Sequence, residues 1–582
     1  MKTIMKNKIF TLFLCVAMLG STSCVDDLLN RPSATELPTT LFWNNIDDAE
    51  KAMYGVYQGT RTFFNKSYLW DGHSDIMWAR SATPTPSVGS SYGAHWNNGW
   101  TVVNRANYAL FHIEQMLQKF PAENDQKQLL RIKSEIIFLR AIVYFRMIDL
   151  WKNIPYYTHI LKDNNEAYSL TQTPISEIKD NILKDLDYAK DYLPPIVAEG
   201  ERGRASRASV YGYMGKIKLY WACWKKNPVY PEDLNLTEAE QYYKAAAIDF
   251  AEVMKPVYGR KLYKDGAPGI SISPFYYDLF DGRNEYSEEI IFATSNAGPN
   301  FGQGLGDTYI YDFGTRSTGA GGSNVTPNLR LVNRYQMINT GDYAPALIPN
   351  SNETLSGGAC NPESYKGRDY RLFATVMWDG QKMLRLSDDG MKVGPDSMIF
   401  KYKQGDNVTY INAQAANSGY IFRKFVRQYA FGPREEGQQD TYLMRLPDLW
   451  LMYCEAVNEY NNGPTDECFE LINKIRRRAA LPDLDKTKFN TRDTFFKAIE
   501  QERIIELIAE GHRFFDIRRW KIAEEVWPQP NGFEYVNTWG EKQGANQFLN
   551  ATDRDFLRYY IFQIPTGEIT KNPRLQQNDC WL

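Results

Sequence analysis

The chain has 582 residues, of which 43% are hydrophobic and 24% charged, with a formal net charge of −3. This is an ordinary globular composition, and the length is sufficient for a large core. Because the near-neutral balance offers no basic surface, we expect no nucleic-acid partner. Aromatic residues make up 14% of the chain, including 38 Tyr and 14 Trp, and their flat faces can pack in a core or stack on a ligand.

The first 23 residues have the pattern of a secretory signal. Three lysines among the first eight residues precede an apolar run over residues 9–20, which is too short for a convincing membrane span. Small residues then lead into Cys24, in a pattern that resembles the signal of bacterial lipoproteins. That resemblance implies cleavage before Cys24, its acylation, and a lipidated tether over residues 24–45, because several acyl chains anchor a protein stably. Asp26 and Asp27 resemble a tag for export to the cell surface. An ordinary secretory peptide with a chance cysteine is the alternative.

Helical periodicity dominates residues 46–255. The pattern predicts helices over residues 49–64, 102–118, 125–151, 175–192, 205–224 and 237–254. Their pairing and lengths of about 15–20 residues are typical of tetratricopeptide-like helix pairs, although the 34-residue consensus of that repeat is absent. Small residues at near-helical spacing over 205–215 indicate a close approach between helices. The stretch from Tyr68 to Trp100 mixes aromatic residues with Gly, Ser, Pro and Asn, which predicts a loop.

The pattern changes over residues 256–440. This stretch holds 23 of the chain's 40 glycines, and long helical periods disappear from it. We predict a loop-rich insertion with a few short strands, among them residues 397–402 and 420–425. Loops carried by a rigid scaffold are frequent binding sites.

Helices resume over residues 442–460 and 466–478, and a longer helical stretch runs from Ile499 to Trp520. In that last stretch we predict one long helix, a turn and a short helix, with Gly511 on the apolar line of the helix. Arg503 is expected to pair with Glu506, and Glu510 with Arg513, along the helix. So many paired charges beside large apolar groups indicate a structural hydrogen-bond network instead of a catalytic site.

Separate stretches of the chain resemble the hallmarks of the SusD (RagB/SusD) family. Residues 502–520 follow the form ER-x-x-EL-x-x-EGHR-x-x-D-x-R-R-W. Residues 139–159 resemble the block LRA-x-x-YF with its following turn, except that Asn153 replaces the expected glycine. Residues 561–581 resemble the family's ending, IP-x-x-E-x-x-x-NP-x-L-x-QN-x-x-W. With the lipoprotein-like start, these blocks span nearly the whole mature chain.

The resemblance implies a mostly α-helical fold, in which a tetratricopeptide-like helix-pair scaffold (46–255 and 441–582) carries the large loop-rich insertion (256–440). It also implies a lipid-anchored outer-membrane protein that faces the cell exterior. Such a protein captures a nutrient, usually a glycan, and delivers it to a SusC-like TonB-dependent transporter. RagB-like members take peptides instead. The resemblance implies no catalysis and no cofactor.

Sugar rings stack on aromatic faces, and amides and charged groups bind their hydroxyls, so aromatic-rich loops are the candidate ligand site. The first candidate arc comprises Trp70, Trp78, Tyr92, Trp96, Asn97, Asn98 and Trp100. The second lies in the insertion and comprises Phe275, Tyr276, Tyr277, Tyr309, Tyr311 and Trp378. Taken singly, each of these residues is more often found in a core than on a ligand.

A surface glycoside hydrolase is the competing class, and a purely structural surface protein is the third. Hydrolysis needs two carboxylates about 5–10 Å apart, and acidic pairs such as Glu288/Glu289 are common in any chain of this size. The sequence shows no GxSxG or HExxH motif. Its five histidines and scattered cysteines match neither a zinc site nor a disulfide framework, and we expect free buried thiols.

Overall fold

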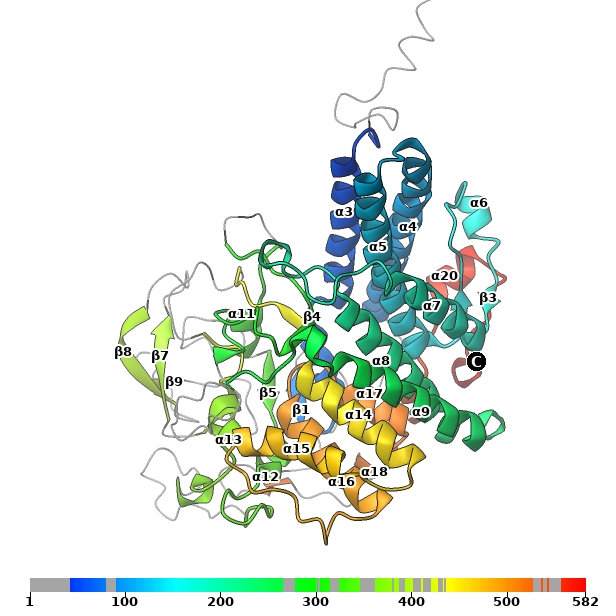
Figure 1. Cartoon of the computed structure of the whole chain (residues 1–582). Coiled ribbons are helices and arrows are strands. Elements are labelled where there is room, and N and C mark those ends of the chain that lie inside the picture. Colours follow the sequence, from blue (N-terminus) through cyan, green and yellow to red (C-terminus); the bar gives the residue numbers. More distant parts are fainter. Residues whose placement is uncertain are drawn as a thin grey trace, which may run out of the picture.

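The computed structural model is mostly helical, as predicted (Figure 1). It describes residues 42–79, 90–264, 278–299, 301, 304–314, 324–345, 362–378, 381–386, 393–400, 410–411, 420–427, 433, 436–526, 535–536, 542–543 and 556–582. The predicted signal peptide, Cys24 and most of the tether lie outside these ranges, as do Phe275, Tyr276 and Tyr277. Within the described ranges, no helix has both the length and the apolar character needed to cross a membrane.

Six long helices form the N-terminal scaffold. They are α3 (Ile46–Phe64), α4 (Ser90–Lys119), α5 (Glu123–Trp151), α7 (Ile175–Ala189), α8 (Arg207–Lys226) and α9 (Leu236–Val253). Neighbours in sequence pack side by side, with α3 on α4, α4 on α5 and α8 on α9. Gly215 explains the close approach of α8 to α9, because a Cβ there would lie 2.6 Å from the Phe250 ring. The predicted helix pairs are therefore confirmed.

The predicted loop from Tyr68 to Trp100 is wrong over most of its described residues. The chain there forms the 3-10 helix η1 (Ser67–His73), the short strand β1 (Met77–Ala79) and the first turns of α4, which begins at Ser90. Gly99 shows why composition misled the prediction. Glycine lowers helix propensity by about 1 kcal/mol, but a Cβ at Gly99 would lie 2.5 Å from Met147 Sδ, so the glycine permits α4 to pack on α5.

Short elements make up the described parts of the insertion. They are β4 (Ile290–Thr294), α11 (Tyr309–Phe313), β5 (Val325–Pro327), α12 (Leu329–Arg334), α13 (Tyr370–Thr375), β6 (Val376–Met377), β7 (Lys382–Leu386), β8 (Val393–Phe400), β9 (Tyr410–Ile411) and β10 (Ile421–Phe422). The expected strand at 397–402 corresponds to the end of β8, and that at 420–425 to the shorter β10. Two sheets join the insertion to the rest of the chain, because β1 pairs with β5 and β4 pairs with β11 (Thr441–Arg445), both antiparallel.

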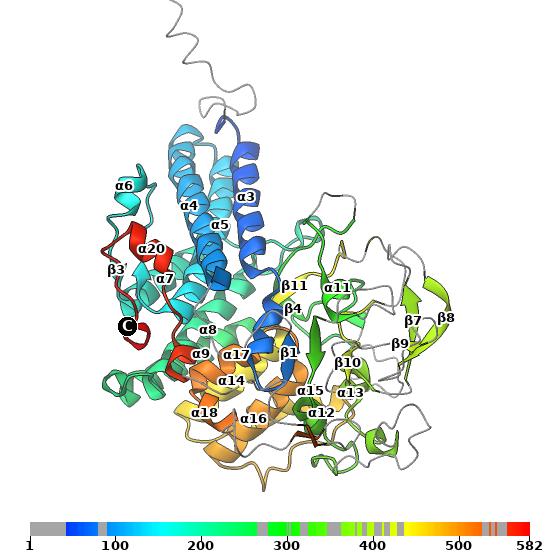
Figure 2. The ribbon, with the colours of Figure 1, turned by 180° about the vertical axis from the view of Figure 1, so that it is seen from behind.

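The C-terminal helices return to the scaffold. They are α14 (Leu446–Tyr460), α15 (Asp466–Arg478), α16 (Arg492–Glu506), α17 (Arg513–Trp520), α18 (Ala523–Val526), α19 (Phe556–Tyr560) and α20 (Thr566–Lys571). Helix α14 packs on α9, α15 and α16. Figure 2 shows α20 beside α7 and β3 (Gln172–Thr173), where Asn572 Nδ2 donates to the Leu170 carbonyl at 2.8 Å.

Minor elements complete the described chain. They are β2 (Ile154–Pro155), α6 (Asn164–Ala167), η2 (Glu199–Glu201), η3 (Pro231–Asp233), η4 (Pro256–Tyr258), η6 (Pro362–Tyr365), β12 (Tyr535–Val536), β13 (Lys542–Gln543) and η7 (Asp579–Trp581). The domain boundaries at residues 255 and 440 stay predictions.

The hallmark stretch forms a helix, a turn and a short helix, as predicted. Its first helix, α16, begins at Arg492 and ends at Glu506, and Gly511 lies in the turn with φ 80°, not on the apolar line of the helix. A Cβ on Gly511 would lie 2.2 Å from the Ser67 carbonyl oxygen, so only glycine fits. Ile499 of α16 belongs to the helical core, whereas Ile504 belongs to a second core beneath the insertion. The hallmark helix therefore joins the two cores.

Candidate functional site

Arg445 lies at the centre of a buried group of charges where β11 meets α14. Its guanidinium binds three carboxylates, Glu289 at 2.7 Å, Glu506 at 2.8 Å and Glu510 at 2.7 Å. All four side chains are almost completely buried. Because Glu289 directly precedes β4 of the insertion and the other two glutamates lie in the hallmark stretch, Arg445 connects the insertion to the scaffold.

Glu506 is shared by three arginines. Besides Arg445, Arg478 Nη2 lies 2.6 Å from one carboxylate oxygen and Arg371 Nη1 lies 2.9 Å from the other. Burial alone would raise the pKa of Glu506, but the charges of Arg478, Arg445 and Arg371 outweigh burial and lower that pKa to about 2. The carboxylate therefore stays ionised inside the protein.

The predicted pairing of Arg503 with Glu506 along the helix is wrong. Arg503 Nε instead lies 2.7 Å from Asp516 Oδ2 on α17, and its Nη1 lies 2.9 Å from Asp448 Oδ1 on α14. Helical spacing predicts contacts between side chains on one helix. Because the helix breaks between α16 and α17, Arg503 instead faces α14 and α17. The pairs are consequently tertiary contacts.

Arg513 likewise does not pair with its predicted partner, Glu510. Its guanidinium binds Asp75 at 2.8 Å and Glu500 at 2.9 Å. Nearby, the carboxylate of Asp71 accepts hydrogen bonds from the backbone N–H groups of Gly511 at 3.0 Å and Arg513 at 2.9 Å. The turn of the hallmark stretch thus fixes the segment from η1 to β1.

His512 is buried among these charges. Burial lowers its pKa to about 4, and the nearby Lys216 and Arg503 act in the same direction against Asp448. Its Nδ1 lies 3.9 Å from Asp448 Oδ2, and its side chain is 8% exposed. A neutral, enclosed imidazole among paired charges fits the predicted structural network.

The first predicted aromatic arc does not form one platform. Trp96 is only 2% exposed and packs edge-on against Trp151 at 5.1 Å. Trp100 lies with its face on Tyr157 at 5.6 Å. The amphipathic pattern of α4 directs these rings toward α5, so Trp96 presents no ring face to a ligand in this structure.

Two further rings of the first arc also contact the scaffold. Trp70 stacks on Phe514 of α17 at 5.3 Å, and Tyr92 packs against Phe562 at 4.4 Å. Both rings are partly buried against the helical core. Asn97 is exposed and Asn98 is half-buried on α4.

The second arc is also divided. Tyr309 is buried and stacks on Phe425 at 4.3 Å, and Trp378 is buried and stacks on Tyr365 at 4.3 Å. These two rings fill the core beneath the insertion, so they are not available for stacking on a ligand. Tyr311 is half-buried on α11.

Trp78 and Tyr311 are the candidates that remain on the insertion side. Trp78 is half-buried and lies between the buried Met77 and Ala79 in β1, so its side chain faces the opposite side of the ribbon. Strand β1 pairs with β5, and α11 packs against β5. Neither ring belongs to the two cores as described above. One member of each arc therefore lies in the β1–β5 sheet or on the helix that packs against it.

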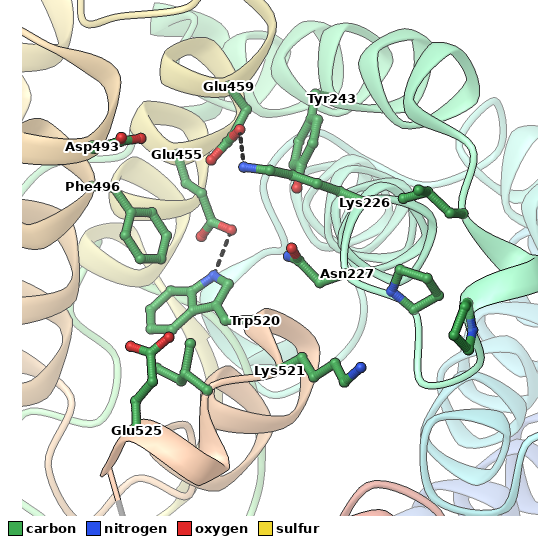
Figure 3. Close-up of a pocket in the computed structure, with 14 residues that line it drawn as sticks. Lys226, Asn227, Tyr243, Glu455, Glu459, Asp493, Phe496, Trp520, Lys521 and Glu525 are labelled. Carbon is green, nitrogen blue, oxygen red and sulfur yellow. Dashed lines mark hydrogen bonds and ion pairs between the residues drawn. The ribbon is translucent and has the colours of Figure 1, made fainter.

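One hollow of about 530 Å³ lies where α8, α14 and α17 meet, and we call it the Trp520 hollow (Figure 3). Lys226 points to Glu459 at 2.5 Å, and Trp520 Nε1 donates to Glu455 at 2.8 Å. Glu455 also binds Arg519 Nη2 at 2.7 Å. Lys226 and Glu455 are thus each paired, and the Trp520 ring is buried.

A second hollow, of about 440 Å³, lies beside the C-terminal tail, and we call it the Lys152 hollow. Trp224 and Tyr230, both half-buried, line it together with Lys152 and Arg518. Sequence reasoning missed these aromatic residues because they belong to the end of a predicted helix and the Pro-rich turn after it. The run of Trp, Tyr and Pro over residues 221–231 was the available signal.

The possible metal ligands and the cysteines of the described residues were predicted to have no chemical role. Within the described ranges, no group of three His, Cys, Asp or Glu side chains is arranged to hold a metal ion. Cys223, Cys454 and Cys468 are free and buried, as predicted, whereas Cys580 is free but half-buried. Burial raises the pKa of Cys223 to about 12, which makes its thiol unreactive at neutral pH.

Comparisons with known proteins agree with this architecture. The model of the SusD family matches residues 288–581, and a model described as starch-binding and associating with the outer membrane matches residues 41–219. SusD-like protein P2 of Formosa agariphila is 22% identical over 99% of both chains. The starch-binding protein SusD of Bacteroides thetaiotaomicron is 23% identical over 92% of this chain and 87% of its own.

A solved structure shares the fold. A SusD-like carbohydrate-binding protein from Bacteroides fragilis superimposes with a TM-score of 0.70 at 21% identity, covering 92% of this chain and 100% of that one. The SusD model covers half of the sequence, including the buried charges around Arg445 and the closing tail. On these grounds the chain belongs to the SusD family.

Proposed function

We propose that this protein captures oligosaccharide at the cell surface and delivers it to a SusC-like TonB-dependent transporter in the outer membrane. The single observation that carries the binding site is the pair of partly exposed rings, Trp78 and Tyr311, on a family fold. Relatives named as starch-binding and carbohydrate-binding support the choice of a glycan as cargo. Sugar C–H faces stack on such rings with little loss of conformational entropy, because aromatic side chains have few rotatable bonds.

The scaffold fixes the segment that leads into Trp78. Asp75, three residues earlier, binds Arg513 through its carboxylate, and its carbonyl accepts a hydrogen bond from Asn328 Nδ2 at 2.7 Å. Tyr559 Oη donates to the carbonyl of His73 at 2.8 Å. A segment whose backbone is fixed before the ligand arrives loses little freedom on binding, and this raises affinity.

Calorimetry of the lipid-free mature chain with neutral glucan oligosaccharides tests the ring site. Trp78→Ala is expected to weaken binding about tenfold or more, because stacking on one ring is worth about 1–3 kcal/mol in nucleic-acid sites and 1.4 kcal/mol is a factor of ten. The melting temperature should hardly change. Tyr168→Ala, which removes an exposed ring from the helical side, is the matched control.

Equal affinity of Trp78→Ala and the wild type would contradict the ring site. Peptides belong in the same panel, and a wild type that binds peptides but no glycan would replace the cargo with that of RagB-like members. Release of new reducing ends from any glycan would overturn the role as a binding protein.

The anchor forms part of the same proposal. Acylation of Cys24 would tie the protein to the outer membrane, with residues 46–582 beyond the tether. Metabolic labelling with palmitate is expected to mark the wild type and not Cys24→Ala. A labelled Cys24→Ala protein would exclude this anchor, and failure to co-purify a TonB-dependent transporter would contradict the delivery step.

A further inference from the structure

The Lys152 hollow is built from parts of the chain that are far apart in sequence. Its walls come from the end of α5, the start of α7, the end of α8 and the tail after α19. In Figure 1 this region, near β3 and the C-terminus, lies on the other side of the molecule from β7 and β8. A volume of about 440 Å³ falls in the range of small-molecule sites, which is about 300–1,000 Å³.

Arg518 of the hallmark stretch lies in the wall of this hollow with an incomplete set of partners. Its Nη2 donates to the carbonyls of Asp149 at 2.8 Å and Tyr560 at 2.7 Å. Its Nε and Nη1 have no hydrogen-bond partner among the described residues, although the side chain is only 5% exposed. The two carbonyls and the rings of Phe514 and Phe562 surround the guanidinium, which makes no ion pair with a carboxylate among the described residues.

Lys152 supplies a second cation to the same hollow. It follows the last residue of α5 with a positive φ of 64°, and its ammonium lies 4.3 Å from the centre of the Trp224 ring. Within the described ranges it makes no ion pair. Burial, followed by the charge of Arg518, lowers the pKa of Lys152 to about 8, so the two cations repel each other.

The carboxylates around the hollow do not balance these two cations. Asp149 lies 2.8 Å from Arg146 and is thereby neutralised. Asp233 and Asp579 are exposed to solvent, which screens their charge. The remaining cation of the lining, Lys225, has Glu238 at 3.8 Å. The hollow thus has a positive interior, while the acidic groups without a close partner are exposed to solvent.

We propose that the Lys152 hollow binds the oxyanion of an acidic sugar, either the carboxylate of a uronate or a sulfate ester, with Lys152 as its direct partner. Charge-assisted hydrogen bonds to such a group are short and strong. The neighbouring charge of Arg518 adds to the attraction, and the partly exposed rings of Trp224 and Tyr230 offer apolar surface to the sugar. This site is separate from Trp78 and Tyr311 and does not depend on the proposed glycan site there.

The test compares D-glucuronate, D-glucose 6-sulfate, D-glucose and acetate by calorimetry on the lipid-free mature chain at pH 7. The two acidic sugars are expected to bind at least tenfold more tightly than glucose and acetate. Lys152→Met should lose at least tenfold in affinity for both acidic sugars. Lys226→Met, which removes a lysine from the neighbouring Trp520 hollow, is the matched control and should bind as the wild type does.

The pH dependence of binding tests the role of Lys152 in the wild type, without any variant. Binding an anion favours the charged form of Lys152, so affinity should fall between pH 7 and pH 9, and at pH 8 binding should take up protons from the buffer. An affinity that is constant over this range, an unaltered Lys152→Met, or glucose binding as tightly as glucuronate would overturn the proposal. If acetate binds as tightly as glucuronate, the hollow recognises an anion and not a sugar, and the proposal of an acidic sugar is overturned. Loss of glucan binding in Trp78→Ala concerns only the other site.

Discussion

The helical scaffold and the insertion reach their folded states by different means. Scaffold helices carry their own local signals, such as the Asn45 side chain that accepts a hydrogen bond from Asp48 N–H at the start of α3. They run for 13 to 30 residues in the major elements from α3 to α16, whereas the described strands of the insertion span two to eight. Elements that short are marginal alone and need packing partners.

The insertion obtains those partners from the scaffold. Strand β4 pairs with β11, directly before α14, and β5 pairs with β1, directly after η1. Arg61 of α3 donates to Asn296 Oδ1 at 2.8 Å and to the Gly304 carbonyl at 2.7 Å. The scaffold is therefore expected to tolerate changes in the insertion better than the insertion tolerates changes at the junction.

Breaking the junction should have the largest effect. Arg445→Met would leave Glu289, Glu506 and Glu510 buried without their shared cation, and removing one member of a buried pair costs about 3–5 kcal/mol. We expect a loss at the upper end of that range in chemical denaturation. Arg477→Met is the control, because its partners Glu470 and Asp483 are exposed and such pairs are worth about 0–1 kcal/mol. Equal stability of the two variants would contradict this account of the junction.

The second largest effect on stability should come from a cavity inside the scaffold. Trp96→Ala removes a buried ring from between α4 and α5, and such truncations cost about 3–5 kcal/mol. The free energy of unfolding should fall accordingly, while the affinity of the folded fraction for glucan stays as in the wild type. Weaker binding at unchanged stability would show that Trp96 contacts the cargo after all.

Acidification should have opposite effects on the stability contributed by the scaffold and by the insertion. The pKa of His512 is about 4 in the folded state against 6.5 ordinarily, so its contribution is complete above pH 6.5 and is lost as pH falls toward 4. One pKa unit is worth 1.36 kcal/mol, so this loss amounts to about 3 kcal/mol at most. Denaturation at several pH values should show that His512→Gln removes this slope.

On the insertion side, burial raises the pKa of Asp440 to about 7 and that of Asp307 to about 6. Their raised values favour the folded state at low pH, and this contribution is lost as pH rises from about 4 toward 7. Asp440→Asn is therefore the control variant, because it should keep the loss of stability that His512 causes on acidification. A His512→Gln protein with the wild-type slope would contradict the assignment to His512.

The sequence was a good guide where a signal is local. The helices over 125–151, 175–192 and 237–254 appear within a few residues of their predicted bounds because apolar spacing on one helix is readable without knowledge of its neighbours. The start of α4 was missed, since Gly99 is explained only by Met147 on another helix. Arg503 was paired wrongly for the same reason, as its partner Asp448 lies 55 residues away.

The candidate site was harder to predict than the fold. Aromatic composition marked Trp78 and Tyr311, but it marked the buried Trp96, Tyr309 and Trp378 equally, because a ring in a core and a ring on a ligand look alike in sequence. The Lys152 hollow was missed altogether. Lys152, after the end of α5, and Arg518 of the hallmark stretch line the same hollow, and only the folded chain brings them together.

The contact between Asp71 and the turn at Gly511 also bears on the order in which the protein assembles. Asp71 accepts the N–H of a residue 440 positions later, so the segment that carries Trp78 gains this support only after nearly the whole polypeptide has been made. Closing so long a loop is entropically unfavourable, and contacts this distant in sequence slow folding. During synthesis from the N-terminus, the segment that carries Trp78 therefore stays without this support until the residues around Gly511 have been added.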